Sequence, residues 1–234
     1  MSINTRIDLL KQRRTKIVAT LGPASAEVKT LSRLLQAGVN MFRLNMSHGD
    51  HATHMALVKN IQKSMRETGI TAAIMADLCG PKIRTGKFRA GKAKLNRNAD
   101  VTLTVRNVPG DENLIPSQYK QLHKDVSPGD RILLNDGLIT LEVKAKEGTE
   151  VYCRVVHGGI ISDHKGINMP DSVVSTPALT SKDKKDASFA LAQGVDYLSL
   201  SFVRTADEIH KLRRIIQRHN STAHIIAQIE TPMA

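Results

Sequence analysis

Residues 38–45 read GVNMFRLN, and the chain repeats this pattern at residues 194–201 as GVDYLSLS. Each copy places a glycine suited to end a helix before a run of residues suited to a buried strand. The two copies align without gaps, as expected where one strand-and-helix unit recurs. Together with similar hydrophobic runs before, between and after these copies, the sequence predicts five strands, at residues 15–20, 41–45, 72–78, 197–201 and 224–228.

The segments between these strands predict helices. Ser25 is expected to cap the first helix, with Val28, Leu31 and Leu35 on its buried face. The second helix is expected to bury Val58, Ile61 and Met65 and to end at Gly69. Two capping boxes, Thr180 with Asp183 and Thr205 with Glu208, predict the starts of the later helices. Alternation of this kind is typical of a parallel sheet covered by helices, so the fold class is α/β.

Residues 79–166 follow a different pattern. Val101, Leu103 and Val105 alternate with threonines, as in a strand that buries one face. The run Asn135-Asp136-Gly137 separates two strand-like segments, 131–134 and 138–143, and predicts a hairpin. We therefore expect a small all-β domain, 79–166, inserted into a first domain that comprises residues 1–78 and continues over 167–234.

Composition narrows the class of protein. The 234 residues are 41% hydrophobic and 3% aromatic, without tryptophan, and carry a formal net charge of +12. This charge favours anionic partners, while the scarcity of aromatic residues argues against nucleic acid, whose bases stack on such rings. Cys79 and Cys153 lack the spacing of a metal-binding pair. Residues 1–14 contain no apolar signal segment and no run is long enough to span a membrane, so we expect a cytoplasmic protein.

Polar side chains gather at the ends of the predicted strands. Arg43, Asn45 and Ser47 share one face of the second strand, and Asp77 ends the third. Gln228 and Glu230 share a face at the end of the fifth. In β/α folds the active site lies at this edge of the sheet, which makes the group a candidate site. The alternative is a structural polar network at the same edge.

The other motifs of the sequence do not point to a functional site. His48, His51 and His54 recur three residues apart without a fourth zinc ligand, and His51 and His54 are expected on a solvent-exposed helix face. A basic cluster of Lys182, Lys184 and Lys185 is likewise expected to face solvent. The sequence contains neither of the two glycine-rich motifs that most often bind nucleotide phosphates.

Several segments together resemble the pyruvate kinase family. They are TKIVATLGPAS (15–25), FRLNMSHG (42–49), GPKIRTG (80–86), LNDG (134–137) and KGIN (165–168), with Asp77, Ser201-Phe202 and Ile229-Glu230. They cover nearly the whole chain in the order of the family. The resemblance implies a partial TIM (β/α)8-type barrel with a small all-β barrel domain inserted after its third strand.

The resemblance also implies an activity. The family transfers the phosphoryl group of phosphoenolpyruvate to ADP, giving pyruvate and ATP in glycolysis, with Mg²⁺ and usually K⁺. Its members are homotetramers that bind these small molecules and no membrane or nucleic acid.

Residue by residue, the family pattern assigns roles to this sequence. Arg43 and Arg84 would neutralise phosphoryl oxygens, and Thr20, Pro23, His48 and Lys165 match positions near the nucleotide. Asn45, Ser47, Asp77 and the carbonyl of Leu78 would form the monovalent-cation site, with Asn45 also in contact with substrate. Glu230 matches one of the two carboxylates that hold Mg²⁺. Lys82 stands where family members that need K⁺ commonly have Glu, so its ammonium is expected to replace that ion.

Two departures from the family pattern bear on activity. The catalytic lysine of the family is replaced by Gln228, which can donate a hydrogen bond but carries no charge. The sequence also ends before the second Mg²⁺ carboxylate and the last strands of the barrel. We therefore expect a truncated pyruvate kinase chain that is weak or inactive and that self-associates or aggregates. A non-catalytic phosphate- or nucleotide-binding remnant and a basic interaction protein are the two alternatives.

Overall fold

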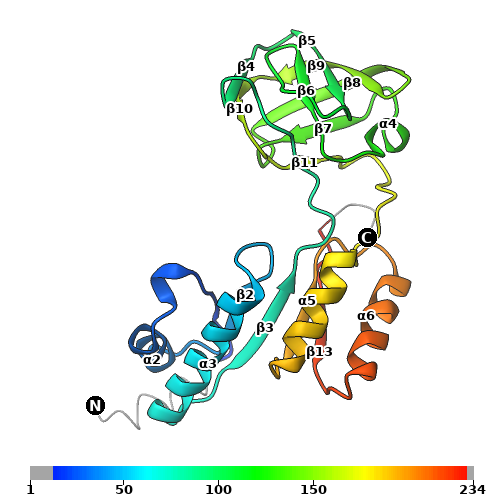
Figure 1. Cartoon of the computed structure of the whole chain (residues 1–234). Coiled ribbons are helices and arrows are strands. Elements are labelled where there is room, and N and C mark those ends of the chain that lie inside the picture. The colour runs from blue at the N-terminus through cyan, green and yellow to red at the C-terminus, as the bar shows by residue number, and fades with distance from the viewer. Residues whose placement is uncertain (1–12, 231–234) are drawn as a thin grey trace. The chain divides into compact units, whose positions relative to one another are not determined.

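The computed structural model describes residues 13–230 and divides them into two compact units (Figure 1). One unit comprises the residues up to Gly80 together with Ala178–Glu230, and the other comprises Pro81–Pro177. Each unit has its own cluster of buried hydrophobic side chains. Among the described helices, none is both long and apolar enough to cross a membrane.

The first unit is built on a five-stranded parallel sheet in the order β1-β2-β3-β12-β13. The strands are β1 (Val18–Thr20), β2 (Met41–Asn45), β3 (Ala73–Leu78), β12 (Tyr197–Leu200) and β13 (His224–Ala227). The helices between them are η1 (Pro23–Ser25), α2 (Val28–Gln36), α3 (His51–Thr68), α5 (Ser181–Ala192) and α6 (Ala206–Arg218). The predicted alternation of strand and helix is therefore confirmed.

Helix packing follows the predicted faces. Leu31 and Leu35 of α2 and Ile61 of α3 are buried, and α2 packs beside α3 as α5 packs beside α6 (Figure 1). The two capping boxes are present at Thr180 and Thr205. Gly69 ends α3 in the left-handed conformation, with φ +66°, which glycine adopts without steric cost.

Two details of the first β/α unit differ from the predictions. Ser25 does not cap α2, because its hydroxyl accepts the N–H of Gly22 at 3.0 Å inside the short η1 turn. The strand predicted from residue 15 begins at Val18. Just before it, the N–H of Ile17 donates to the side chain of Asn40 at 2.9 Å, which takes the place of a strand-to-strand bond.

The regular elements of the second unit are strands, apart from the short helix α4. A six-stranded sheet has the order β11-β7-β8-β9-β5-β6, and β10 pairs with β4 in a two-stranded sheet. The elements are β4 (Lys92–Leu95), β5 (Asp100–Thr104), β6 (Leu114–Pro116), α4 (Leu122–Asp125), β7 (Arg131–Leu134), β8 (Ile139–Glu147), β9 (Glu150–His157), β10 (Gly159–Ser162) and β11 (Ile167–Asn168). The predicted domain boundaries at 78/79 and 166/167 stay a prediction.

The predicted hairpin joins β7 to β8. These strands are antiparallel and pair Leu134 with Ile139 across the turn. Asn135, Asp136 and Gly137 all have positive φ, at 51°, 57° and 85°, which is the backbone geometry that Asn, Asp and Gly tolerate best. Turn chemistry alone was sufficient to predict this connection.

Candidate active site

The carboxyl ends of the five parallel strands bring a set of polar side chains together in the first unit. In the sheet register Thr20 lies beside Arg43, Asn45 beside Asp77, and Asp77 beside Ser199. Because residues in register on parallel strands point to the same face, their side chains converge. The predicted gathering of Arg43, Asn45 and Asp77 at this edge is therefore confirmed.

Arg43 forms an ion pair with Asp77. Its Nε donates to Oδ2 of Asp77 at 2.7 Å, a second guanidinium N–H reaches the same oxygen, and Nη1 donates to the hydroxyl of Thr20 at 3.0 Å. The Asp77 side chain is 5% exposed, whereas that of Arg43 is 32% exposed. The guanidinium has more N–H donors than these contacts use, so Asp77 holds it in place while part of it remains accessible to an anion.

Gln228 occupies the other side of the same carboxylate. Its amide nitrogen donates to Oδ1 of Asp77 at 2.6 Å and lies 2.5 Å from the hydroxyl of Ser199. Its carbonyl oxygen accepts from Ser201 at 3.3 Å, and the Ser201 hydroxyl also lies 2.8 Å from the carbonyl of Leu78. Asp77 thus links Arg43 on β2 to the residue that follows β13.

The remaining candidates of this unit lie around that link. The side-chain oxygen of Asn45 accepts the N–H of Ser47 at 3.0 Å. Glu230 is exposed and accepts the N–H of Phe202 at 3.1 Å. Thr20, Pro23 and His48 are exposed.

Three predicted site residues belong to the second unit. Arg84 donates to the carbonyl of His164 at 2.8 Å and pairs with Gly166. The backbone N–H of Lys165 donates to Thr85 at 2.9 Å, which brings Lys165 and Arg84 into one local structure. Lys82 is exposed.

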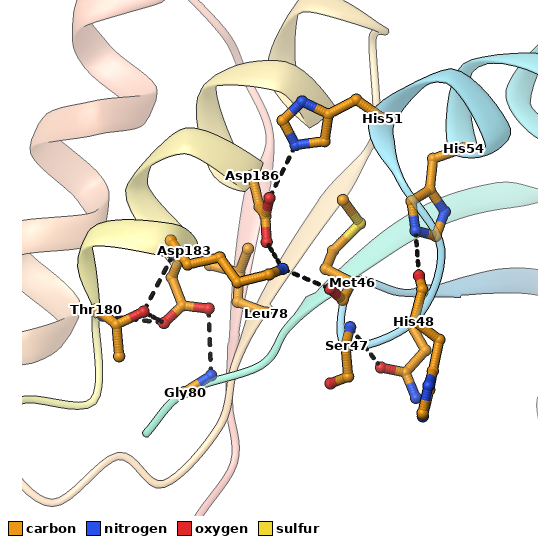
Figure 2. Close-up of polar contacts among 12 residues, drawn as sticks. Met46, Ser47, His48, His51, His54, Leu78, Gly80, Thr180, Asp183 and Asp186 are labelled. Atoms are coloured by element: carbon orange, nitrogen blue, oxygen red, sulfur yellow. Dashed lines mark hydrogen bonds and ion pairs between the residues drawn. The ribbon is translucent and has the colours of Figure 1, made fainter. Parts of the chain in front are cut away.

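The solvent-exposed position predicted for His54 was wrong, whereas His51 is exposed as predicted. His54 is 6% exposed, and its Nε2 donates to the carbonyl of His48 at 2.8 Å (Figure 2). The Nε2 of His51 lies 2.8 Å from Asp186 of α5, and its ring stacks on Phe189 with centroids 4.2 Å apart. Helical spacing showed where these residues stand on α3, but it gave no sign of the carbonyl and the carboxylate that they contact.

The solvent exposure predicted for Lys182 is confirmed, although its contacts were not predicted. Its side chain is 57% exposed, but its ammonium lies 2.7 Å from the carbonyl of Met46 and 2.5 Å from Asp186, whose side chain is 4% exposed (Figure 2). Lys184 and Lys185 are exposed as predicted. Asp186 carried no motif, and its (i, i+4) spacing from Lys182 on α5 was the one available signal.

Oxygen atoms at the strand ends are suited to bind cations that prefer oxygen ligands. Asn45, Ser47, Asp77 and the carbonyl of Leu78 offer amide, hydroxyl, carboxylate and carbonyl oxygens, which are the ligands that such ions take. Among the described residues no group of three or more His, Cys, Asp and Glu side chains could hold a metal ion. A cation here would therefore rely on neutral oxygens and on substrate as well as on the carboxylates.

Comparison with known proteins identifies relatives of this chain. The model of the pyruvate kinase barrel domain matches residues 12–233. The chain is 42% identical over 223 residues to pyruvate kinase from Corynebacterium efficiens. The aligned region covers 95% of this chain and 47% of that protein. The chain is 41% identical over 222 residues to pyruvate kinase from Geobacillus stearothermophilus, covering 94% of this chain and 38% of that protein. The chain thus spans less than half the length of these relatives.

Proposed function

Because the chain belongs to the pyruvate kinase family, we propose that it carries part of a site that transfers the phosphoryl group of phosphoenolpyruvate to ADP. The observation that supports this most is the Arg43–Asp77–Gln228 cluster at the strand ends. An arginine held by a buried carboxylate and still partly exposed is a preorganised binding group for a phosphate.

Arg43, Asp77 and the other predicted site residues have separate tasks in this proposal. Arg43 binds the phosphoryl oxygens and offsets their charge, and Asp77 fixes the orientation of the guanidinium. Asn45 contributes a further hydrogen bond to the substrate. Arg84 of the second unit adds positive charge, and Thr20, Pro23, His48 and Lys165 bind the nucleotide. In phosphoryl transfer, positioning and charge stabilisation account for most of the rate, and these residues contribute to both.

The cations of the family fit the oxygen donors of this chain. We propose that Asn45, Ser47, Asp77 and the Leu78 carbonyl hold a monovalent cation, K⁺ in most of the family, or that the Lys82 ammonium replaces this ion. Glu230 would hold Mg²⁺, which, when bound, supplies positive charge to the transferring phosphoryl group. The exposure of Glu230 leaves its second oxygen accessible for that role.

We propose the same domain division for this chain as for its family. Residues 1–78 and 167–234 would form part of a TIM-type barrel, and residues 79–166 would form the inserted all-β domain. The grouping of contacts into one unit up to Gly80 and from Ala178, and another over Pro81–Pro177, supports an insertion near these positions. The strands of the second unit, interrupted by the single-turn α4, support its β character.

Gln228 lowers the expected rate. Its amide donates to Asp77 and adds no charge to the site. The lysine of the family would instead face the phosphoryl group that is being transferred. Replacing one preorganised stabilising group in other enzymes changes turnover by roughly 10²–10³. We therefore propose that this chain turns over slowly at most, and that Gln228→Lys accelerates it by about 10² or more.

The test measures ATP formation from phosphoenolpyruvate and ADP, beside calorimetric titration of each substrate. Gln217→Lys is the matched control, because Gln217 is exposed on α6 and gains the same charge away from the cluster. Faster turnover in Gln228→Lys but not in the control supports the proposal. Binding without turnover in both proteins would favour a non-catalytic binding role, and the absence of binding and turnover would favour a basic interaction protein.

A further inference from the structure

We infer that Lys182 is a positioning residue for Asn45 and acts by holding the peptide that joins Met46 to Ser47. The effect on substrate binding rests on the proposed function, in which Asn45 is a substrate-binding residue. Figure 2 shows Lys182 of α5 reaching the segment that follows β2.

One peptide group carries both contacts. Its carbonyl, that of Met46, lies 2.7 Å from the ammonium of Lys182. Its N–H, that of Ser47, donates to the side-chain oxygen of Asn45 at 3.0 Å. Because a peptide is planar, rotation of the group about its neighbouring bonds moves both contacts together. Lys182 thus controls whether the N–H points at Asn45.

The same contacts decide which end of the Asn45 amide is available. An N–H can bond to the oxygen of the amide and not to its nitrogen, so the Ser47 contact fixes the amide flip. The NH₂ group is left to donate elsewhere. A cationic donor on the Met46 carbonyl also polarises the peptide, which strengthens the N–H as a donor to Asn45.

The position of Lys182 is fixed by Asp186, which also contacts helix α3 through His51. Its ammonium lies 2.5 Å from Oδ2 of Asp186, and Oδ1 of the same carboxylate lies 2.8 Å from the ring of His51 at the start of α3. His51 in turn stacks on Phe189 of α5. These contacts tie the start of α3 and the Met46 peptide to one buried carboxylate, so the lysine does not sample solvent freely.

A simpler reading is that Lys182 and Asp186 form an ordinary (i, i+4) pair on a helix surface. Such pairs form on exposed faces and contribute little. Here the carboxylate is buried, and the ammonium also contacts a carbonyl 136 positions earlier in the sequence. An open pocket of about 450 Å³, lined by Met46, His51, His54, Lys182 and Asp186 among others, lies beside this contact. The lysine therefore spans from α5 to the site-bearing segment, which a surface pair does not do.

The first experiment needs no ligand. NMR on the full chain compares Lys182→Met, which keeps the length of the side chain, with Lys185→Met on the exposed face of α5. We expect the Ser47 amide to exchange with solvent about tenfold faster in Lys182→Met, since the peptide that carries this N–H is no longer held in place. The Asn45 side-chain NH₂ signals should shift as well. Unchanged Ser47 exchange and Asn45 signals would overturn the inference.

A second variant guards against loss of folding. Lys182→Met leaves the Asp186 carboxylate buried with one partner fewer, which destabilises proteins strongly. The double variant Lys182→Met/Asp186→Asn removes that charge and keeps a hydrogen-bonding group beside His51. It is expected to show the same change at Ser47 and Asn45, and Lys182→Arg is expected to reverse part of it. A double variant with wild-type Ser47 exchange would contradict the inference even if the single variant unfolds.

A third measurement tests the route to the substrate. Affinity for phosphoenolpyruvate is measured for Lys182→Met in the wild-type chain and in Asn45→Ala. If Lys182 acts through Asn45, we expect a loss of about tenfold in the first background and less than about twofold in the second. Equal losses in both would refute action through Asn45. If the unmodified chain does not bind phosphoenolpyruvate, the proposed function fails, and the NMR result still decides the inference.

Discussion

Lys82 carries the prediction that depends most on a single charge. It is an exposed residue between Pro81 and Ile83 of the second unit, and members of the family that need K⁺ commonly have Glu at its position. An ammonium supplies one positive charge and three donors, which resembles what a bound K⁺ supplies. This role of Lys82 stays a proposal, because it follows from the family pattern.

The prediction for Lys82 is that phosphoenolpyruvate binds to the chain equally well with and without K⁺. In Lys82→Glu, binding should weaken about tenfold without K⁺ and recover when K⁺ is added. The control is Lys87→Glu, which changes the charge by the same amount at another exposed position of the second unit. Calorimetric titrations in K⁺ and in tetramethylammonium salts measure this, and a K⁺ requirement in the unmodified chain would contradict it.

At the residue scale, the sequence predicted positions better than partners. Strand periodicity placed Arg43 and Asn45 on one face, and the structure confirms it. The pairing of Arg43 with Asp77 depends on the register between two strands 34 residues apart, which no local pattern contains. For the same reason no local pattern indicates the backbone carbonyls that His54 and Lys182 contact.

Among the helices, α5 begins with a capping box whose Asp183 also contacts the backbone of another segment. Asp183 accepts from the N–H of Thr180 at 2.9 Å and, with its other oxygen, from the N–H of Gly80 at 3.2 Å (Figure 2). The side chain is fully buried. It therefore satisfies two separate backbone groups, one at the helix start and one just after β3.

Asp183→Ala should consequently cost about 3 kcal/mol in the free energy of unfolding, because it loses a cap and leaves the Gly80 N–H without this acceptor. The matched change is Asp50→Ala at the exposed N-cap of α3, where Asp50 accepts from Thr53 at 2.8 Å. That change should cost about 1 kcal/mol. Urea denaturation measures both, and equal losses would show that the Gly80 contact contributes nothing.

A second prediction at this scale concerns pH and the residues after β11. Arg131 of β7 binds Asp171 through its Nε at 2.8 Å and through its backbone N–H at 3.1 Å. The hydrogen bond from the Arg131 side chain lowers the pKa of Asp171 from 3.8 to about 2. A carboxyl whose pKa is lower in the folded state stabilises the fold fully above its unfolded pKa, and this contribution is lost as pH falls through the folded value.

The difference in unfolding free energy between the wild-type chain and Asp171→Asn should therefore shrink as pH falls from about 5 to about 2. Both partners are substantially exposed, so the effect should be small and should weaken further at high salt. Denaturation monitored at several pH values measures it. A difference that stays constant over this range would contradict the lowered pKa.

Elements were predicted well where local chemistry decides them. The capping boxes, the end of α3 at Gly69 and the hairpin at Asn135–Gly137 each follow from short motifs whose geometry is local. The start of β1 and the role of Ser25 were predicted wrongly. There, tertiary or turn contacts, such as that of the Asn40 side chain with Ile17, competed with the local preference.

For the whole molecule, the alternation of strands and helices predicts the parallel sheet that the structure shows. β1 and β13 are the outermost strands of the described sheet, and Ile17 and Val18 beside the first edge are exposed hydrophobic residues. Exposed edges of this kind favour pairing with further strands. The predicted self-association of residues 1–234 stays a prediction.

The central claim is that the strand ends of this sheet bind a phosphate through Arg43. Three features support this binding: the register of the sheet, the burial of Asp77 and the partial exposure of the guanidinium. Its most direct test is calorimetric titration with phosphoenolpyruvate of the wild-type chain and of two variants. These are Arg43→Met and, as the control, Arg33→Met on the exposed face of α2. We predict binding by the wild type and the control, and a loss of at least about tenfold for Arg43→Met. Equal affinity in all three proteins, or no binding by the wild type, would contradict the claim.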